Sequence, residues 1–167
     1  MSVTEIHIRS IWSPDYIADG ILGIDPSTLK ATGVTHIVFD LDDTLARRRD
    51  SAISPGYLQF VRSLQAADFN VLIATNTPRN ISTLTKRLNA EAVHPKGLSR
   101  KPLRSFYKRV IDKSGAAPDH IVMIGNHILN DIVGANRAGM TTVLVKPLRP
   151  RLSLAYRFYA TYARIHG

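Results

Sequence analysis

The sequence predicts an α/β fold in which helices cover both faces of a mainly parallel β-sheet. Short runs of β-branched and aliphatic residues alternate along the chain with stretches whose apolar residues recur at helical spacing. Strands that alternate with helices form βαβ units, in which the strands run parallel. Polar residues follow several predicted strands directly, which is typical of a ligand site beyond the carboxyl ends of parallel strands.

The elements can be placed in order along the chain. Residues 34–40 (VTHIVFD) form the first predicted strand, because the run is short, rich in β-formers and stopped by polar residues. Ser54 and Pro55 then begin a helix, as N-cap and first residue, that ends near Asp68. Further strands are expected at residues 70–75, 92–94, 120–125 and 141–145, and further helices at 78–88, 102–114 and 130–138.

The length of 167 residues predicts one domain, residues 1–167. We expect its core at about residues 33–147, with an N-terminal extension at 1–30 and a basic, aromatic segment at 148–167. No signal peptide or apolar run of about 20 residues is apparent, so the chain is expected in the cytoplasm, with or without peripheral contact with the inner face of the membrane.

The formal net charge of +9 and the pI near 10.2 indicate an anionic partner. That partner could be a phosphate compound, an acidic lipid surface or nucleic acid; a solvated basic surface without a specific partner is the remaining alternative. The chain has no cysteine, so a bound metal ion would need oxygen or imidazole ligands.

The strongest chemical signal is the run Asp40-Leu41-Asp42-Asp43-Thr44-Leu45 directly after the first strand. A carboxylate fixed at a strand end can act as a nucleophile, and a second one two residues on can act as general acid and base. Paired carboxylates also bind Mg²⁺. A calcium loop is disfavoured, because Leu45 and Ser51 stand where it needs glycine and glutamate. An acidic turn capped by Asp43 and Thr44 remains an alternative.

Four motifs together resemble those of haloacid dehalogenase (HAD) superfamily phosphatases of subclass IIIA. The run at 40–45 resembles the first motif, and Thr75 the second, a hydroxyl that holds the phosphoryl group. Lys101 resembles the third, a cation beside nucleophile and phosphate, and residues 125–131 (GNHILND) resemble the fourth, the acidic metal loop. The resemblance implies a three-layer Rossmann-like fold and Mg²⁺ as cofactor. It assigns catalysis to Asp40, Asp42, Thr75 and Lys101, and substrate binding to Thr75, Asn76 and Lys101.

Within the superfamily the chain resembles the YqeG-type group, which includes phosphatidylglycerophosphate phosphatases. The resemblance rests on residues 14–16 (PDY), 23–26 (GIDP) and 130–139 (NDIVGANRAG), with Thr75-Asn76 and Lys101-Pro102. It implies hydrolysis of phosphatidylglycerophosphate to phosphatidylglycerol through an aspartyl-phosphate intermediate. Alternatives are a phosphatase for a soluble nucleotide, sugar phosphate or phosphoprotein, and a catalytically weakened module that binds phosphate or nucleic acid.

One departure affects the expected metal site. The family usually has aspartate where this chain has Asn126, and an amide oxygen can bind Mg²⁺ but brings no charge. The resemblance implies Asp40, Asp42, Asn126 and Asp131 as metal ligands. Lys96 is a rival of Lys101, which is favoured because Pro102 follows it.

The spacing of the motifs predicts that no cap domain covers the site. About thirty residues separate Thr44 from Thr75, and about twenty-five separate Thr75 from Lys101, too few for a domain. An open site suits a substrate presented by a large body, such as a lipid head group on a bilayer. Residues 149–167 carry arginines and aromatic residues but no acid, which is typical of either an anionic interface or a final helix packed on the sheet. Nucleic acid is not expected as a partner, since no recognised binding motif is present.

Overall fold

The computed structural model describes residues 4–5, 10–47, 52–149 and 154–166. Its strands are β1 (Thr4–Glu5), β2 (Tyr16–Ala18), β3 (His36–Phe39), β4 (Asn70–Ala74), β5 (Glu91–Val93), β6 (Ile121–Gly125) and β7 (Thr141–Val145). Its helical segments are η1 (Ile21–Gly23), α1 (Pro26–Ala31), α2 (Pro55–Ala66), α3 (Ser82–Leu88), α4 (Arg104–Ser114), η2 (Pro118–His120), η3 (Ile128–Val133), α5 (Gly134–Asn136) and α6 (Leu154–His166).

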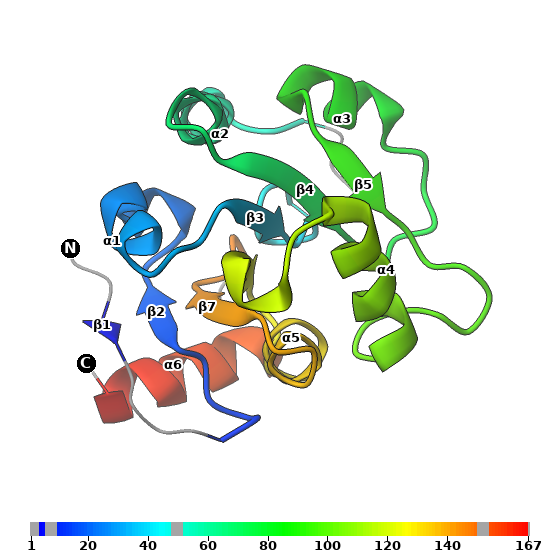
Figure 1. Ribbon diagram of the computed structural model, residues 1–167. Coiled ribbons are helices and arrows are strands. Elements are labelled where there is room, and N and C mark those ends of the chain that lie inside the picture. The colour runs from blue at the N-terminus through cyan, green and yellow to red at the C-terminus, as the bar shows by residue number, and fades with distance from the viewer. Residues whose placement is uncertain (1–3, 6–9, 48–51, 150–153, 167) are drawn as a thin grey trace.

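The strands form one sheet in the order β1-β2-β7-β6-β3-β4-β5. All neighbouring strands run parallel except β1 and β2, which pair antiparallel at the edge. Figure 1 shows α2 and α3 on one side of this sheet and α5 and α6 on the other. The predicted α/β class, with a mainly parallel sheet between two helical layers, is therefore confirmed.

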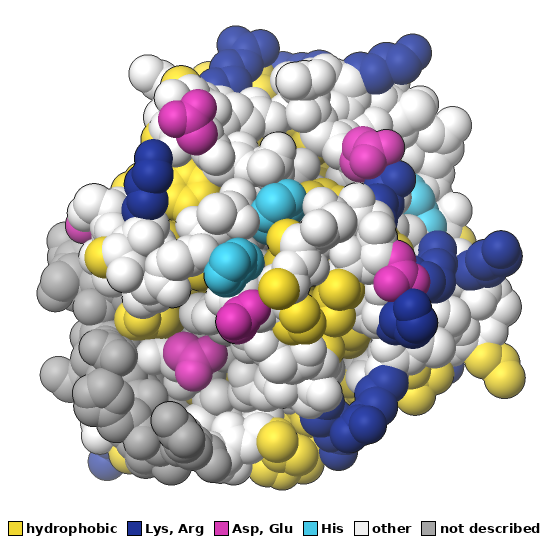
Figure 2. Space-filling view, in the orientation of Figure 1, with side chains coloured by type: hydrophobic (Ala, Val, Ile, Leu, Met, Phe, Trp, Pro, Cys, Tyr) yellow, Lys and Arg dark blue, Asp and Glu magenta, His cyan; other side chains and the backbone are white. Residues whose placement is uncertain are grey.

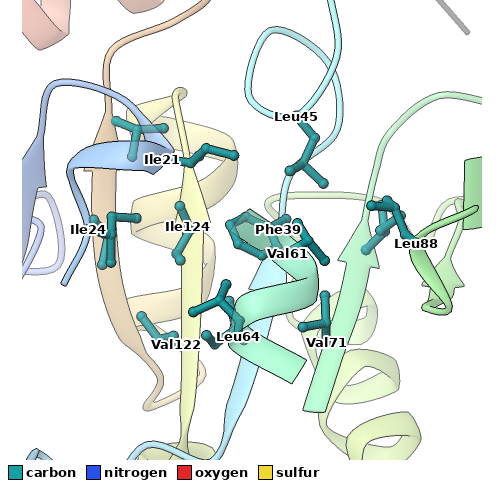
Figure 3. Packing of buried hydrophobic residues seen from close by; sticks show 14 of the residues in the cluster. Ile21, Ile24, Phe39, Leu45, Val61, Leu64, Val71, Leu88, Val122 and Ile124 are labelled. Carbon is teal, nitrogen blue, oxygen red and sulfur yellow. The ribbon is translucent and has the colours of Figure 1, made fainter. Parts of the chain in front are cut away.

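The two helical layers follow from the period of two along each strand. Ile37 and Phe39 of β3 pack on one face with α1, α2 and α3, whereas Val38 packs on the other with α4 and α5. On the first face Val61 and Leu64 of α2 lie against β3, β4 and β6 (Figure 3). Both faces of the central strands are buried, which explains why these strands are apolar runs without alternation.

Helix α2 begins where the sequence predicted. The Ser54 hydroxyl accepts a hydrogen bond from the backbone N–H of Tyr57, and Pro55 occupies the first helical position. Between the first and second motifs, the described residues form α2 and β4, and between the second and third they form α3 and β5; no additional domain is inserted in these described segments. The site is therefore without a cap domain there, as expected.

Two helices begin later than the sequence predicted, and the helix predicted from Asn130 begins earlier, at Ile128. Helix α3 begins at Ser82 rather than Pro78, because the Asn80 side chain accepts from the backbone N–H of Ser82 at 2.8 Å and fixes a turn before the helix. Helix α4 begins at Arg104 rather than Pro102, after a turn in which the backbone N–H of Leu103 donates to the carbonyl of Arg100. Strand β2 and helix α1 lie in the region expected to be an extension, and β2 pairs with β7 inside the sheet.

The C-terminal segment packs on the sheet as helix α6. Tyr159 is buried against Leu144 of β7 and Ile132 of η3, and its hydroxyl donates to the Asp19 carboxylate at 2.5 Å. Arg157 and Arg164 of the same helix remain exposed. Of the alternatives for this segment, the packed helix is confirmed, and its arginines still face outward. Among the residues with described structure, no helix has the length and apolar character needed to cross a membrane.

We predict that Gly134→Ala destabilises the fold. An added Cβ at Gly134 would lie 2.2 Å from Cε2 of the buried Tyr107 ring, and overpacking of this kind costs about 1–3 kcal/mol. The midpoint of thermal unfolding should fall by roughly 2–4 °C per kcal/mol for a chain of this size. Gly56→Ala in α2 is the matched control, because nothing lies within 4 Å of its added Cβ. Equal midpoints for the two variants would contradict the prediction.

Candidate active site

The parallel strands bring the predicted motif residues to one edge of the sheet. Asp40 follows β3, and its backbone N–H extends the ladder by donating to the carbonyl of Ile124 on β6 at 2.8 Å. Thr75 follows β4, and its N–H donates to the carbonyl of Val93 on β5 at 3.1 Å. Because Phe39 pairs with Ile73, Asp40 lies level with Ala74, one residue before Thr75.

The centre of the site is the Lys101 ammonium group, which lies between two carboxylates. Its Nζ donates to Asp40 Oδ1 at 2.5 Å and to Asp131 Oδ1 at 2.7 Å. The side chains of Lys101 and Asp131 are 2% and 1% exposed, and that of Asp40 is 10% exposed. Because these side chains are almost inaccessible to water, direct contact between the charged groups has to offset the cost of their burial.

The surroundings raise the pKa values of Asp40 and Lys101. Burial raises the pKa of Asp40 to about 7, because desolvation and the nearby Asp131 charge together outweigh the attraction of Lys101. Burial would lower the pKa of Lys101, but the carboxylates of Asp131 and Asp40 outweigh burial and raise it. Lys101 therefore remains the cation of the cluster, and the surroundings disfavour the charged form of Asp40.

Neighbouring side chains fix this cluster in place. The Asn76 amide donates to the Lys101 carbonyl at 3.0 Å and accepts from the Lys101 N–H at 2.8 Å. Both polar groups of Asn76 are thus engaged by the backbone of Lys101, which favours a positioning role over the predicted contact with substrate. The Tyr107 hydroxyl donates to the Asn130 carbonyl at 2.6 Å, and burial raises its pKa well above the usual value.

Asp131 is held from its other side as well. Its Oδ2 accepts from the backbone N–H of His127 at 3.0 Å, within the turn that leads into η3. Gly125, at the end of β6, leaves the room that this carboxylate needs, since a Cβ there would lie 2.4 Å from Asp131 Cγ. The glycine of the fourth motif is therefore required by the close approach of Asp131.

The two following carboxylates of the first motif point to different partners. Asp42 is 28% exposed and accepts from Arg79 Nη2 at 3.1 Å. Asp43, whose backbone has a left-handed φ of 63°, accepts from both Nε and Nη2 of Arg149, each at 2.8 Å. Its carbonyl also accepts from the N–H of Leu148 at 2.8 Å. Hydrogen bonds from the segment after β7 therefore fix the loop that carries the first motif.

Thr75 and Thr44 supply hydroxyl groups inside the site. Thr75 is fully buried, and its oxygen accepts from the N–H of Thr77 at 3.0 Å, which leaves its proton to donate elsewhere. The Thr44 hydroxyl donates to Asp40 Oδ2 at 3.2 Å and accepts from Asn126 Nδ2 at 2.9 Å. The first and fourth motifs are thus linked directly by hydrogen bonds.

The oxygen atoms near Asn126 are of the chemical type that binds Mg²⁺. The Asn126 amide nitrogen donates to the Asp42 carbonyl at 2.9 Å, so a rotation of the amide by half a turn would place its oxygen beside that carbonyl. With the Asp40 carboxylate these are hard oxygen donors, as Mg²⁺ prefers. No three acidic, histidine or cysteine side chains gather as a metal group in the part of the chain that is described, so neutral oxygens would have to contribute. Both oxygens of Asp131 are already engaged.

The structure brings together most residues predicted for the site. Asp40, Lys101 and Asp131 form one cluster, and Asn76 joins it through the backbone of Lys101. The sequence interpretation missed Arg79 and Arg149, which lie beyond the carboxyl ends of β4 and β7. The rule that pointed to the aspartates also applies to these two positions, so it could have found them. The rival Lys96 is exposed and pairs with Ser99 through its backbone.

Comparisons with known proteins agree with this arrangement. The HAD-hydrolase-like family matches residues 98–147, which include the third and fourth motifs. A Bacillus subtilis (strain 168) protein described as "Probable phosphatase YqeG" is 25% identical over 152 residues, covering 90% of this chain and 87% of the relative. The chain is therefore similar to phosphatases of the haloacid dehalogenase type.

Solved structures share the fold of this protein. An uncharacterized protein from Listeria monocytogenes serotype 4b superposes with a TM-score of 0.57 at 18% identity, over 66% of this chain and 78% of the other. A HAD phosphatase from Thermococcus onnurineus superposes with a TM-score of 0.51 at 21% identity, over 60% of this chain and 48% of the other. At such identities the likeness concerns the fold alone.

We predict that Asp40→Asn stabilises the protein more at high pH than at low pH when metal is chelated. The folded pKa of Asp40, about 7, lies above the ordinary 3.8, so its contribution to stability is largest below about pH 4 and falls as pH rises through 7. The loss is at most about 1.4 kcal/mol per pH unit. Thermal unfolding in EDTA at pH 5, 6, 7 and 8 measures it, with Asp112→Asn on the exposed face of α4 as control. A constant difference between Asp40→Asn and wild type would refute the assigned shift.

Proposed function

We propose that this chain is a Mg²⁺-dependent phosphomonoesterase that works through an aspartyl-phosphate on Asp40, with a phospholipid head group as substrate. The observation that carries the phosphomonoesterase proposal is the ammonium of Lys101 held 2.5 Å from the Asp40 carboxylate at the open edge of a parallel sheet. A carboxylate beside a buried cation can approach a phosphate dianion with less repulsion.

The proposed reaction has two steps. One oxygen of Asp40 attacks phosphorus while Asp42 gives a proton to the leaving alcohol oxygen, and the bond from phosphorus to that oxygen breaks. Asp42 then takes a proton from water, whose oxygen attacks phosphorus and displaces Asp40. The Thr75 hydroxyl and Lys101 hold the transferring oxygens.

The residues suited to Mg²⁺ are Asp40, the carbonyl of Asp42 and the amide oxygen of Asn126. A bound Mg²⁺ would offset the charge of the phosphate and of the Asp40 carboxylate. Asp131, predicted as a further ligand, is better placed to hold Lys101, since one of its oxygens lies 2.7 Å from Nζ. Asn126 contributes no charge, so we expect metal binding to be weak.

Three features support a lipid head group as substrate. The resemblance to the YqeG-type group implies phosphatidylglycerophosphate, and the lack of an inserted cap in the described segments leaves room for a bulky substrate. The net charge is +9, and Arg157 and Arg164 of α6 are exposed one heptad apart. Each basic residue near an anionic surface contributes roughly 1 kcal/mol to binding. On the face seen in Figure 2, lysine and arginine side chains lie around the margin with acidic ones among them.

We predict Mg²⁺-dependent release of phosphate from phosphatidylglycerophosphate in anionic vesicles. Asp40→Asn should lower kcat at least about a thousandfold, because the attacking oxygen is lost while volume is kept. Parallel assays use a nucleotide, a sugar phosphate and a phosphopeptide. Faster turnover of a soluble ester than of the lipid would replace the lipid proposal by the soluble alternative. Full turnover by Asp40→Asn would overturn the mechanism.

We predict that Asn126→Asp lowers the Mg²⁺ concentration that gives half-maximal activity. A charged oxygen replaces a neutral one beside the Asp42 carbonyl, 2.9 Å from the present amide nitrogen. Without metal the new carboxylate would repel that carbonyl, so Mg²⁺ should also raise the unfolding midpoint more in this variant than in wild type. Asn70→Asp, exposed at the start of β4, is the control. An unchanged half-saturation point would show that residue 126 is not a ligand.

A further inference from the structure

Arg79 lies beside the catalytic loop on the short segment between β4 and α3. Its backbone N–H donates to the Thr77 hydroxyl at 3.5 Å, and the N–H of Thr77 donates in turn to Thr75. Its guanidinium contacts Asp42 through Nη2 at 3.1 Å. Within the described structure, its Nε is buried and has no hydrogen-bond partner. A buried donor without an acceptor is uncommon and points to an acceptor that the resting protein does not supply.

The three cations of the site differ in how firmly they are held. Lys101 contacts two buried carboxylates, and Arg149 makes two hydrogen bonds to Asp43 in fork geometry. Arg79 contacts one oxygen of Asp42, and both partners are about a quarter exposed, at 26% and 28%. Ion pairs that are partly exposed and joined by a single contact are weak, and the cation can readily exchange its partner for another anion. Arg79 is therefore the cation that an incoming anion can recruit at the smallest cost.

The position of Arg79 also defines which part of a substrate it can meet. In the mechanism proposed above, Asp42 protonates the leaving oxygen, so it lies on the side of the leaving alcohol. Arg79 contacts Asp42 and must lie on that side too. A group recognised by its guanidinium would thus belong to the leaving alcohol rather than to the transferred phosphate.

We propose that Arg79 is a specificity residue that selects phosphomonoesters whose leaving alcohol carries a second negative charge. The inference rests on the proposed phosphatase function and names the substrate class of the same site. In the resting protein the Arg79 guanidinium donates a hydrogen bond to Asp42. A carboxylate or phosphodiester on the substrate replaces it, accepts hydrogen bonds from Arg79, and releases the Asp42 side chain to face the leaving oxygen. Phosphatidylglycerophosphate belongs to this class, since a phosphodiester is part of its leaving alcohol.

The test compares soluble probes that differ in that charge. Glycerol 3-phosphate has a neutral leaving alcohol, 3-phosphoglycerate adds a carboxylate, and glycerophosphoglycerol phosphate, the deacylated head group, adds a phosphodiester. Wild-type protein should show a kcat/KM about ten- to a hundredfold higher for at least one anionic probe than for glycerol 3-phosphate, as expected for charge-assisted hydrogen bonds. Arg79→Gln should remove most of this preference, and Arg79→Lys should keep part of it.

The ratio between two probes measured on one preparation does not depend on the fraction of folded protein, so an unstable variant still gives a valid result. Arg62→Gln, on the exposed face of α2, is the matched control and should keep the wild-type ratio. If Arg79→Gln lowers turnover of all probes equally, Arg79 only positions Asp42 and the inference fails. It fails as well if wild type shows no preference for either anionic probe. If wild type hydrolyses no probe and no lipid, the phosphatase function itself is overturned.

Discussion

A buried ammonium between two carboxylates is the constraint on which the proposed catalytic edge of this protein depends. Lys101, Asp40 and Asp131 come from three separate segments, and their charges are compensated only when all three meet. Removing the Lys101 ammonium would leave buried carboxylate charge unpaired, which costs about 3–5 kcal/mol. The two hydrogen bonds between Asn76 and the Lys101 backbone, and the small size of Gly125, allow these three groups to meet. Positioning the proposed catalytic groups and compensating their buried charge are therefore one requirement here.

The rim of the site follows a different principle from its centre. Asp42 and Asp43 are neighbours in one loop but differ in their contacts. Asp42 accepts a single, partly exposed hydrogen bond from Arg79, whereas both oxygens of Asp43 accept hydrogen bonds from Arg149. Arg149 lies in the segment just after β7, so the conformation of the loop at Asp42 and Asp43 depends on a residue far away in the chain. The contact of Asp42 is weak enough to be exchanged. A fixed backbone with one adjustable side chain suits a residue that must move a proton.

Much of the fold and of the candidate site could be predicted from the sequence, for physical reasons. The central strands are buried on both faces and therefore appear as short apolar runs, and parallel strands bring the residues after them to one edge, which located Asp40 and Thr75. Helix starts were harder to predict, because a single side-chain hydrogen bond such as that from Ser82 to Asn80 delays α3 by four residues relative to Pro78. The strand-end rule also applies to the position of Arg149 after β7, but its pairing with Asp43 depends on the tertiary fold.

Asn126 links the metal chemistry to the structure of the loop. Its amide donates to the Asp42 carbonyl and to the Thr44 hydroxyl, so the first and fourth motifs are joined by hydrogen bonds that need no ion. An aspartate there would set a charged oxygen against that carbonyl, and only a cation between them would make the arrangement favourable. The neutral amide therefore keeps the loop ordered without metal, and it lowers the charge available to hold one. Metal binding through the amide oxygen of Asn126 would have to break these hydrogen bonds, so the metal and the loop contacts compete for the same side chain.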